Sequence, residues 1–134
     1  MPQKKDGLYI FEGLTQKEIA YFIMMSETLR FEVGAKIMTE GDISDNYAYL
    51  IESGSVDIYR HDKKIDSLHS GDIFGEMALI ADEPRSATIL ANTVVEVLVF
   101  HKEEFLLLCK KSWIYADIKW KILKRVKDNF YQNK

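Results

Sequence analysis

The chain has 134 residues, 47% of them hydrophobic, and a formal net charge of −3 at pH 7. This length fits a single domain spanning residues 1–134, and the composition excludes a disordered chain. Residues 110–134 carry eight Lys or Arg and two Asp. A basic tail therefore follows an acidic body, and we expect no direct nucleic acid binding.

The N-terminus and the cysteine content indicate a cytoplasmic protein. Residues Met1 to Asp6 are polar, and no apolar segment typical of a signal peptide follows them. The longest apolar runs are far shorter than the ~20 residues that a membrane-spanning helix needs. Cys109 is the one cysteine, so an internal disulfide cannot form. We expect no membrane span.

The N-terminal segment, residues 1–28, is predicted to be helical. Thr15 and Glu18 have the spacing of a capping box, and the residues around and after them are apolar at helical spacing. These apolar residues are Leu14, Ile19, Phe22, Ile23 and Met25. The pattern predicts a helix from about residue 16 to 27.

Residues 29–100 have the pattern of short strands. Phe31 and Val33 alternate with charged neighbours, as in a half-buried strand. Turn signals then recur: Gly34-Ala35, Glu40-Gly41-Asp42, Ser53-Gly54, His61 to Lys64, and Asn92-Thr93. Strands separated in this way predict an antiparallel, jelly-roll-like β-roll, in a mainly β fold with flanking helices.

Helical spacing returns in the C-terminal segment, residues 101–134. We expect one helix from Lys102 to Lys110 and a second from Trp113 to about Tyr131, which Ser112 caps. The second helix carries an apolar stripe of Ile114, Ile118, Ile122, Val126 and Phe130, with Ala116, Trp120 and Leu123 beside it. Such a stripe permits a homodimer, although it is more often part of a core.

One stretch, residues 71–88, interrupts the strand pattern and carries chemistry. A short helix from about Glu76 to Ile80 follows Gly75, and the unpaired N–H groups of Glu76, Met77 and Ala78 at its start would attract an anion. Arg85 adds a planar cationic fork that fits phosphate oxygens. The Glu76 carboxylate suits a sugar hydroxyl. The ligand inferred from these groups has a phosphate beside a ribose. The alternative is a structural turn in which Arg85 pairs with Glu76 or Asp82.

Residues 74–88 resemble the phosphate-binding cassette of cyclic nucleotide-binding domains, the type found in kinase regulatory subunits and catabolite activator proteins. The matching pattern is Phe-Gly-Glu-x-Ala-Leu, a short gap, and Pro-Arg-x-Ala. Further matches follow the family's order: Phe11 to Leu14, Glu40 to Asp42, Tyr49 to Ile51, Glu52 to Val56, and Gly71-Asp72.

The resemblance implies a binding site and assigns its roles. Arg85 would pair with the cyclic phosphate, and Glu76 would accept from the ribose 2′-hydroxyl. Backbone N–H groups would contact sugar or phosphate oxygens. The implied ligand-binding residues are Phe74, Gly75, Glu76, Met77, Ala78, Arg85, Ser86 and Ala87, and Phe74, Leu79 and Ile89 would wall the pocket or the core.

The resemblance leaves the choice between cAMP and cGMP open at Ser86. Kinase regulatory subunits often have Ala at this position, many cGMP-binding relatives have Thr, and catabolite activator proteins have Ser and prefer cAMP. We favour cAMP. Asp82 and Glu83, in the variable gap of the cassette, would weaken anion binding somewhat.

The resemblance also implies that nucleotide binding is relayed through the C-terminal helix. In this family a residue of the C-terminal helix covers the base, and spacing does not choose among Trp113, Tyr115, Ile118, Trp120, Ile122 and Leu123. Nucleotide would favour a closed arrangement of this helix. The output would come from an unidentified effector protein or output domain.

A jelly-roll-like fold is also compatible with two other functions. A cupin-like metalloenzyme would cluster its histidines, but His61, His69 and His101 lie far apart in the chain. We therefore expect no catalytic residues, no metal site and no cofactor besides the nucleotide ligand. The second alternative is a degenerate family member that serves as a protein-interaction domain without binding nucleotide.

Overall fold

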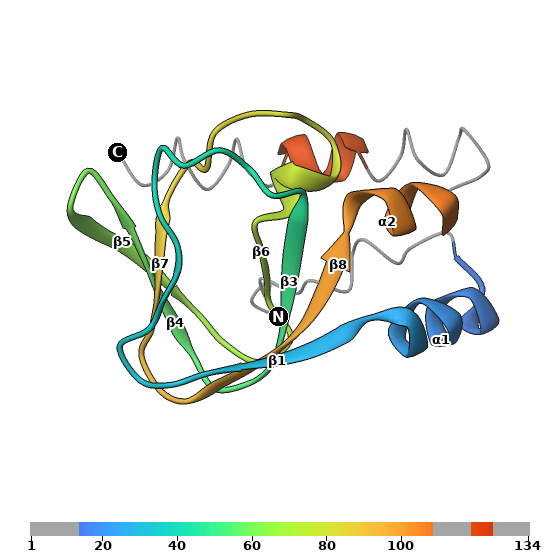
Figure 1. Ribbon diagram of the computed structural model, residues 1–134, viewed down its shortest axis with the longest axis horizontal. Coiled ribbons are helices and arrows are strands. Elements are labelled where there is room, and N and C mark those ends of the chain that lie inside the picture. Colours follow the sequence, from blue (N-terminus) through green and yellow to red (C-terminus); the bar gives the residue numbers. More distant parts are fainter. Residues whose placement is uncertain (1–13, 109–118, 125–134) are drawn as a thin grey trace.

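The computed structural model describes residues 14–108 and 119–124 (Figure 1). Its first helix, α1, spans Gln16–Met25. The predicted capping box is present: the Glu18 N–H donates to Thr15 Oγ1 at 3.1 Å, and the Thr15 N–H donates to Glu18 Oε1 at 2.9 Å. The helix ends two residues before the predicted boundary, because strand β1 begins directly after Ser26.

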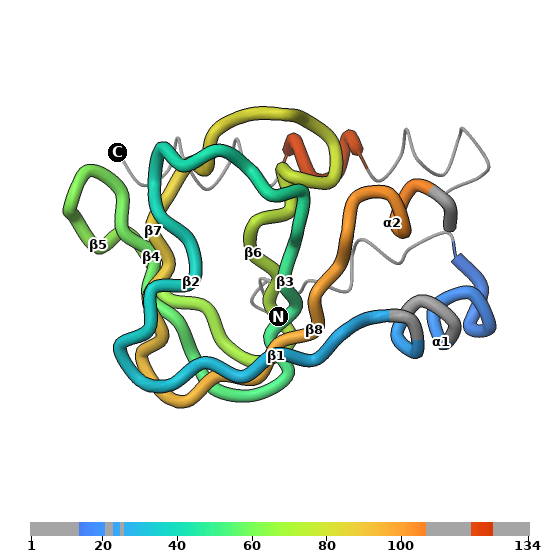
Figure 2. The backbone as a smooth tube through the Cα atoms, viewed as in Figure 1, coloured from blue at the N-terminus to red at the C-terminus, as the bar shows by residue number. Residues whose placement is uncertain are grey.

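The described residues form two four-stranded antiparallel sheets, which confirms the predicted β-roll. The first sheet has the order β1-β8-β3-β6 and the second the order β2-β7-β4-β5. The bounds are β1 Glu27–Phe31, β2 Lys36–Met38, β3 Tyr47–Ser53, β4 Val56–Arg60, β5 Lys63–Leu68, β6 Ile73–Phe74, β7 Thr88–Ala91 and β8 Val95–His101. The chain therefore crosses repeatedly from one sheet to the other, and Figure 2 shows its course.

The turn between β4 and β5 is shorter than predicted. Only His61 and Asp62 lie between the strands, and both have positive φ, 54° and 62°. A two-residue turn of this conformation matches the twist of a hairpin. Lys63 and Lys64 therefore belong to β5, although the sequence placed them in the turn.

Two hydrophobic clusters form the core. One lies between the sheets and is built from alternating strand residues such as Ile51, Val56 and Val97. The other covers the outer side of β3 and β8 and includes Leu79, Phe105 and Ile122. The second cluster therefore joins the roll to the C-terminal helices.

Three short helical segments pack at one end of the roll. The segment after β6, η2, is a 3₁₀-helix over Glu76–Leu79 and packs against β3 and α2. Helix α2 spans Lys102–Leu108 and lies beside α1 (Figure 1). Of the predicted last helix, residues 119–124 are described, and they are helical.

Several predicted features lie outside the described residues. They include Cys109, Ser112, Trp113, Tyr115, Ile118 and most of the apolar stripe. Among the helices that are described, none is long and apolar enough to cross a membrane.

Candidate functional site

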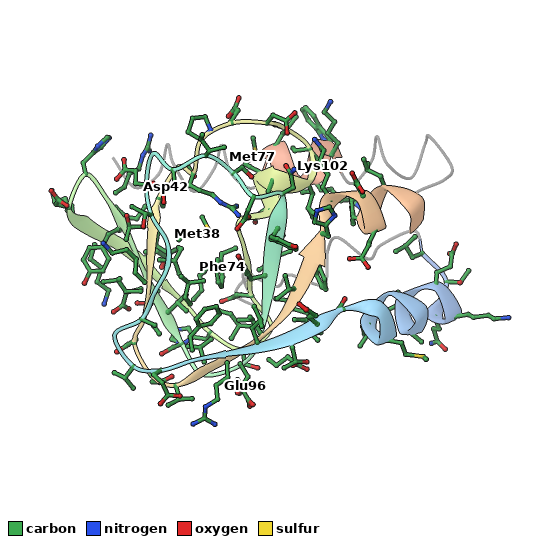
Figure 3. All side chains as sticks on the ribbon, in the orientation of Figure 1. Met38, Asp42, Phe74, Met77, Glu96 and Lys102 are labelled. Carbon is green, nitrogen blue, oxygen red and sulfur yellow. The ribbon has the colours of Figure 1, made fainter. Side chains whose placement is uncertain are left out.

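A pocket lies where the cassette meets the inner faces of the sheets. All eight residues that the resemblance implied line it: Phe74, Gly75, Glu76, Met77, Ala78, Arg85, Ser86 and Ala87. The strands contribute Met38, Ile58, Ile65, Asp66, Leu68, Ile73 and Ile89. Figure 3 shows Met38 and Phe74 between the sheets and Met77 above them on the short helix.

The sharp turn at Gly75 makes the cassette compact. Gly75 has a φ of 72°, a left-handed conformation that glycine adopts without strain. A Cβ at this position would lie 3.1 Å from Arg85 Nη1 and 3.2 Å from Met38 Sδ. The absence of a side chain at Gly75 therefore permits both the left-handed turn and the close approach of Arg85.

The short helix begins differently from our expectation. The Ala78 N–H donates to the Gly75 carbonyl oxygen at 3.1 Å, because a 3₁₀-helix bonds each residue to the one three positions earlier. The prediction that the Ala78 N–H is unpaired is therefore wrong in this conformation. The expected helix from 76 to 80 also ends one residue earlier, at Leu79.

Two backbone hydrogen bonds fix Arg85 to a distant loop. The Arg85 N–H donates to the Asp42 carbonyl oxygen at 2.7 Å, and the Gly41 N–H donates to the Arg85 carbonyl oxygen at 2.8 Å. The Glu40-Gly41-Asp42 turn thus pairs with the Pro-Arg end of the cassette. Figure 3 shows Asp42 on the loop that borders the pocket.

The side chain of Arg85 is buried and aims its guanidinium at the pocket wall. Arg85 is 8% exposed, the one charged residue among the buried positions that the structure describes. Its Nη2 donates to Asp45 Oδ1 at 2.5 Å and to the Tyr47 carbonyl oxygen at 3.0 Å. Its Nη1 makes a longer contact, 3.4 Å, with the Gly75 carbonyl oxygen. The cation is thus held by three oxygen atoms, two at Nη2 and one at Nη1.

Asp45 is a site residue that sequence reasoning missed. We expected Arg85 to pair with Glu76 or Asp82 if the segment were only a turn. Asp82 instead forms an ion pair with Lys102 at 3.4 Å, and Arg85 takes Asp45 from the loop before β3. Forty residues separate the partners, and no spacing rule links positions so far apart.

Tyr49 lies beside this ion pair, at the wall formed by β3. Its ring stacks on Phe74 with centroids 5.0 Å apart and planes 17° apart. Burial raises the pKa of the Tyr49 phenol, and the nearby Asp45 carboxylate raises it further, while the Arg85 cation opposes the shift. The phenol therefore stays neutral beside the charged pair.

Comparison with known proteins agrees with this geometry. Residues 28–112 match the family described as the cyclic nucleotide-binding domain. The chain belongs to this family.

Similar segments occur in a protein kinase and in a protein kinase regulatory subunit. The domain is 39% identical to a cGMP-dependent protein kinase of Plasmodium berghei over 85 residues, which are 63% of this chain and 10% of that protein. It is 40% identical to a cAMP-dependent protein kinase regulatory subunit of Colletotrichum orbiculare over 98 residues, which are 72% of this chain and 25% of the relative. The chain thus spans a quarter or less of these relatives.

Solved structures show the same fold. The catabolite activator protein of Thermus thermophilus matches with a TM-score of 0.78 and 26% identity, over 92% of this chain and 60% of that chain. A cyclic nucleotide-binding-like protein of Brucella abortus matches with a TM-score of 0.69 and 26% identity, over 76% of this chain and 90% of that chain. The similarity to these two structures therefore extends over most of this chain.

The remaining predicted residues fall on the rim, the walls and the core. Ser86 is exposed and lines the rim of the pocket. Phe74 and Ile89 line the pocket and belong to the cluster between the sheets. Leu79 lies in the other cluster and does not line the pocket.

The residues predicted to cover the base differ in burial. Ile122 is fully buried in the cluster with Leu79, and Trp120 is 66% exposed. Within the described segment 119–124, Trp120, Ile122 and Leu123 do not line the pocket. Trp113, Tyr115 and Ile118 lie outside the described residues.

Proposed function

We propose that this cyclic nucleotide-binding domain is a sensor that binds cAMP in preference to cGMP and passes the binding event to an effector through its C-terminal helices. The observation that carries the proposal is that Arg85 and Glu76 line the same pocket, nine residues apart in the cassette. A cation and a carboxylate so placed suit a phosphate joined directly to a ribose.

The phosphate would meet the side of Arg85 that faces the pocket. Asp45 and the Tyr47 carbonyl oxygen occupy Nη2, and a guanidinium has five N–H donors in a fixed fork. The Nε donor and the Nη1 hydrogen that does not face the Gly75 carbonyl oxygen would therefore serve the phosphate, while Asp45 orients the fork. The Met77 and Ala87 N–H groups would supplement this charge pairing, and Glu76 would accept from the 2′-hydroxyl.

The preference for cAMP rests on Ser86 and not on the relatives in sequence. Relatives named for cAMP and for cGMP match at nearly equal identity. Ser86 is also the residue that catabolite activator proteins carry at this position.

The relay would run through the cluster shared by the cassette and the helices. Leu79 of η2, Phe105 of α2 and Ile122 of the last helix pack together, and Lys102 at the start of α2 pairs with Asp82 of the cassette. A ligand that repositions the cassette would therefore change how these helices pack, and it would shift the population toward the arrangement that binds it better. The relatives' names support a protein kinase as the class of effector.

Titration calorimetry with cAMP, cGMP and 5′-AMP tests the proposal. We expect cAMP to bind most tightly and 5′-AMP to bind weakly, because its open phosphate carries more charge and more bulk. A folded chain that binds none of the three would refute the sensor and favour an interaction domain. Hydrogen exchange of residues 119–124 with and without saturating cAMP tests the relay, and identical exchange would refute it.

A further inference from the structure

A second hollow lies at the end of the first sheet, where β8 leads into α2. It is lined by Glu27, Tyr47, Val99, His101 and Glu104, and none of these residues lines the cassette pocket. Its volume is about 420 Å³. Figure 1 shows α2 continuing from β8 at this place, with β1 and β3 beside β8.

The register of the strands brings four of these residues to one face of the sheet. Glu27 lies opposite Val99, and Tyr47 lies opposite His101. Val99 and His101 are two positions apart on β8, so their side chains point to the same side. Val99 is 6% exposed and belongs to the cluster between the sheets. The hollow therefore continues the inner face of the sheet and has an apolar floor.

Two carboxylates from different elements border this floor. Glu27 begins β1, and Glu104 lies in the first turn of α2. In the part of the chain that the structure describes, neither of them forms an ion pair. Lys102, the cation nearest to Glu104 in sequence, pairs with Asp82 of the cassette instead. The described residues therefore leave the negative charge of the hollow uncompensated.

An aromatic ring forms one wall of the hollow. The Tyr47 ring meets the His101 ring edge-on, with centroids 5.0 Å apart and planes 66° apart. Tyr47 is 36% exposed, and an accessible aromatic face attracts cations. No group of His, Cys, Asp and Glu among the described residues could hold a metal ion. An organic cation on an apolar stem, such as an arginine side chain, fits this combination of floor, wall and carboxylates.

Strand β1 offers a place for the backbone that would carry such a side chain. It is an edge strand, paired with β8 on one side, and its first four residues are exposed. An extended segment of another protein can add to an edge of this kind through main-chain hydrogen bonds. A residue of that segment opposite Glu27 would direct its side chain to the same face as Glu27. That face is the one on which the hollow lies.

We propose that the hollow binds an arginine side chain of an extended segment of a partner protein, and that this segment adds to the free edge of β1. The stem of the arginine would lie on Val99 and Tyr47, and its guanidinium would pair with Glu27 and Glu104. This site goes beyond the proposed function and does not depend on it. Tyr47 nevertheless joins the two sites, because its carbonyl oxygen accepts from Arg85 Nη2 at 3.0 Å.

A titration followed by NMR tests the proposal on the 134-residue chain without nucleotide. The probe is acetyl-Thr-Val-Arg-Val-Thr-amide, and its control replaces arginine with the neutral isostere citrulline. We expect the arginine peptide to bind about fivefold more tightly, the value of a partly exposed charge pair, and to shift the amide signals of β1, Val99 and His101. Equal affinity of the two peptides, shifts spread over the whole acidic surface, or no binding at millimolar concentration would overturn the proposal.

Agmatine separates a protein segment from a small organic cation as the ligand. It carries the guanidinium on an apolar stem but has no peptide backbone to pair with β1. We expect it to bind more weakly than the arginine peptide. If agmatine binds as tightly as the peptide, the assignment to a protein segment is wrong.

Matched variants locate the effect. Glu27→Gln and Glu104→Gln keep the size of the side chain and remove its charge, so each should reduce the preference for arginine over citrulline. Glu103→Gln makes the same change at an exposed neighbour on α2 that does not line the hollow, and the preference should stay as in the wild type. A preference that persists in the Glu27 and Glu104 double variant overturns the proposal. A chain that shows this preference but binds no cyclic nucleotide would support the site and refute the proposed function.

Discussion

The guanidinium of Arg85 and the carboxylate of Asp45 form an ion pair at the pocket wall, although forty residues separate them in the chain. The Arg85 side chain is 6% exposed and that of Asp45 is 55% exposed. A buried cation needs a partner, because desolvation of an unpaired charge is costly. Asp45 therefore holds the pocket's cation in place from the solvent side.

Replacement of Asp45 by Ala should destabilise the domain. The free energy of unfolding is expected to fall by about 1 kcal/mol, a modest value because Asp45 is half exposed. Urea titration measures it. Asp42→Ala is the matched control on the same loop, since Arg85 uses the Asp42 backbone rather than its side chain. An equal loss in both variants would contradict the role of the Asp45 carboxylate.

Replacement of Arg85 separates charge from geometry in phosphate binding. Arg85→Lys keeps the charge but loses the planar fork, and the cAMP affinity should fall at least about tenfold. Arg85→Ala should lose several kcal/mol, because it also removes the charge. Calorimetry gives both values, with Arg30→Ala as a surface control on β1. Near-native affinity in Arg85→Ala would refute the assigned role.

Glu76→Gln tests the contact with the ribose. The carboxylate would accept from the 2′-hydroxyl more strongly than an amide oxygen, so cAMP affinity should fall by about tenfold. Binding of 2′-deoxy-cAMP should change little, and discrimination between the two nucleotides should narrow. Glu83→Gln removes a neighbouring carboxylate of the same pocket and should leave that discrimination unchanged. Unaltered discrimination in Glu76→Gln would exclude the ribose contact.

The sequence predicted the parts of this domain that depend on local pattern. The capping box at Thr15, the strand alternation and the spacing of Gly75, Glu76 and Arg85 are all readable within a few residues. What it could not predict depends on contacts between distant segments or on small differences in backbone geometry. Asp45, for example, reaches Arg85 only through the fold.

The conformation of the short helix η2 also depends on contacts between distant segments, so the sequence did not predict it. Four residues can bond as an α-turn or as a 3₁₀-turn with little difference in composition, and packing decides between them. In this domain η2 packs against β3 and α2. The Ala78 N–H is therefore used inside the turn, where the sequence alone predicted an unpaired donor.

The raised pKa of the Tyr49 phenol predicts a loss of stability at high pH. Both states are protonated below the phenol's usual pKa, near 10, so this contribution is fully present there. Above that value the unfolded chain releases its proton while the folded domain retains it, and stability falls as pH rises toward the folded pKa. Unfolding of wild type and Tyr49→Phe from pH 7 to 11 measures the difference. A constant difference over this range would contradict the shift.

Ile122 is the described residue through which the last helix joins the core. It is fully buried with Leu79 and Phe105, so Ile122→Ala should lower the free energy of unfolding by about 2–4 kcal/mol. It should also loosen the last helix from the cassette, so that saturating cAMP no longer changes hydrogen exchange of residues 119–124. Leu123→Ala, at a 40% exposed neighbour, should keep both properties. If the Ile122 variant still shows the full cAMP-dependent change in exchange, the relay does not pass through this cluster.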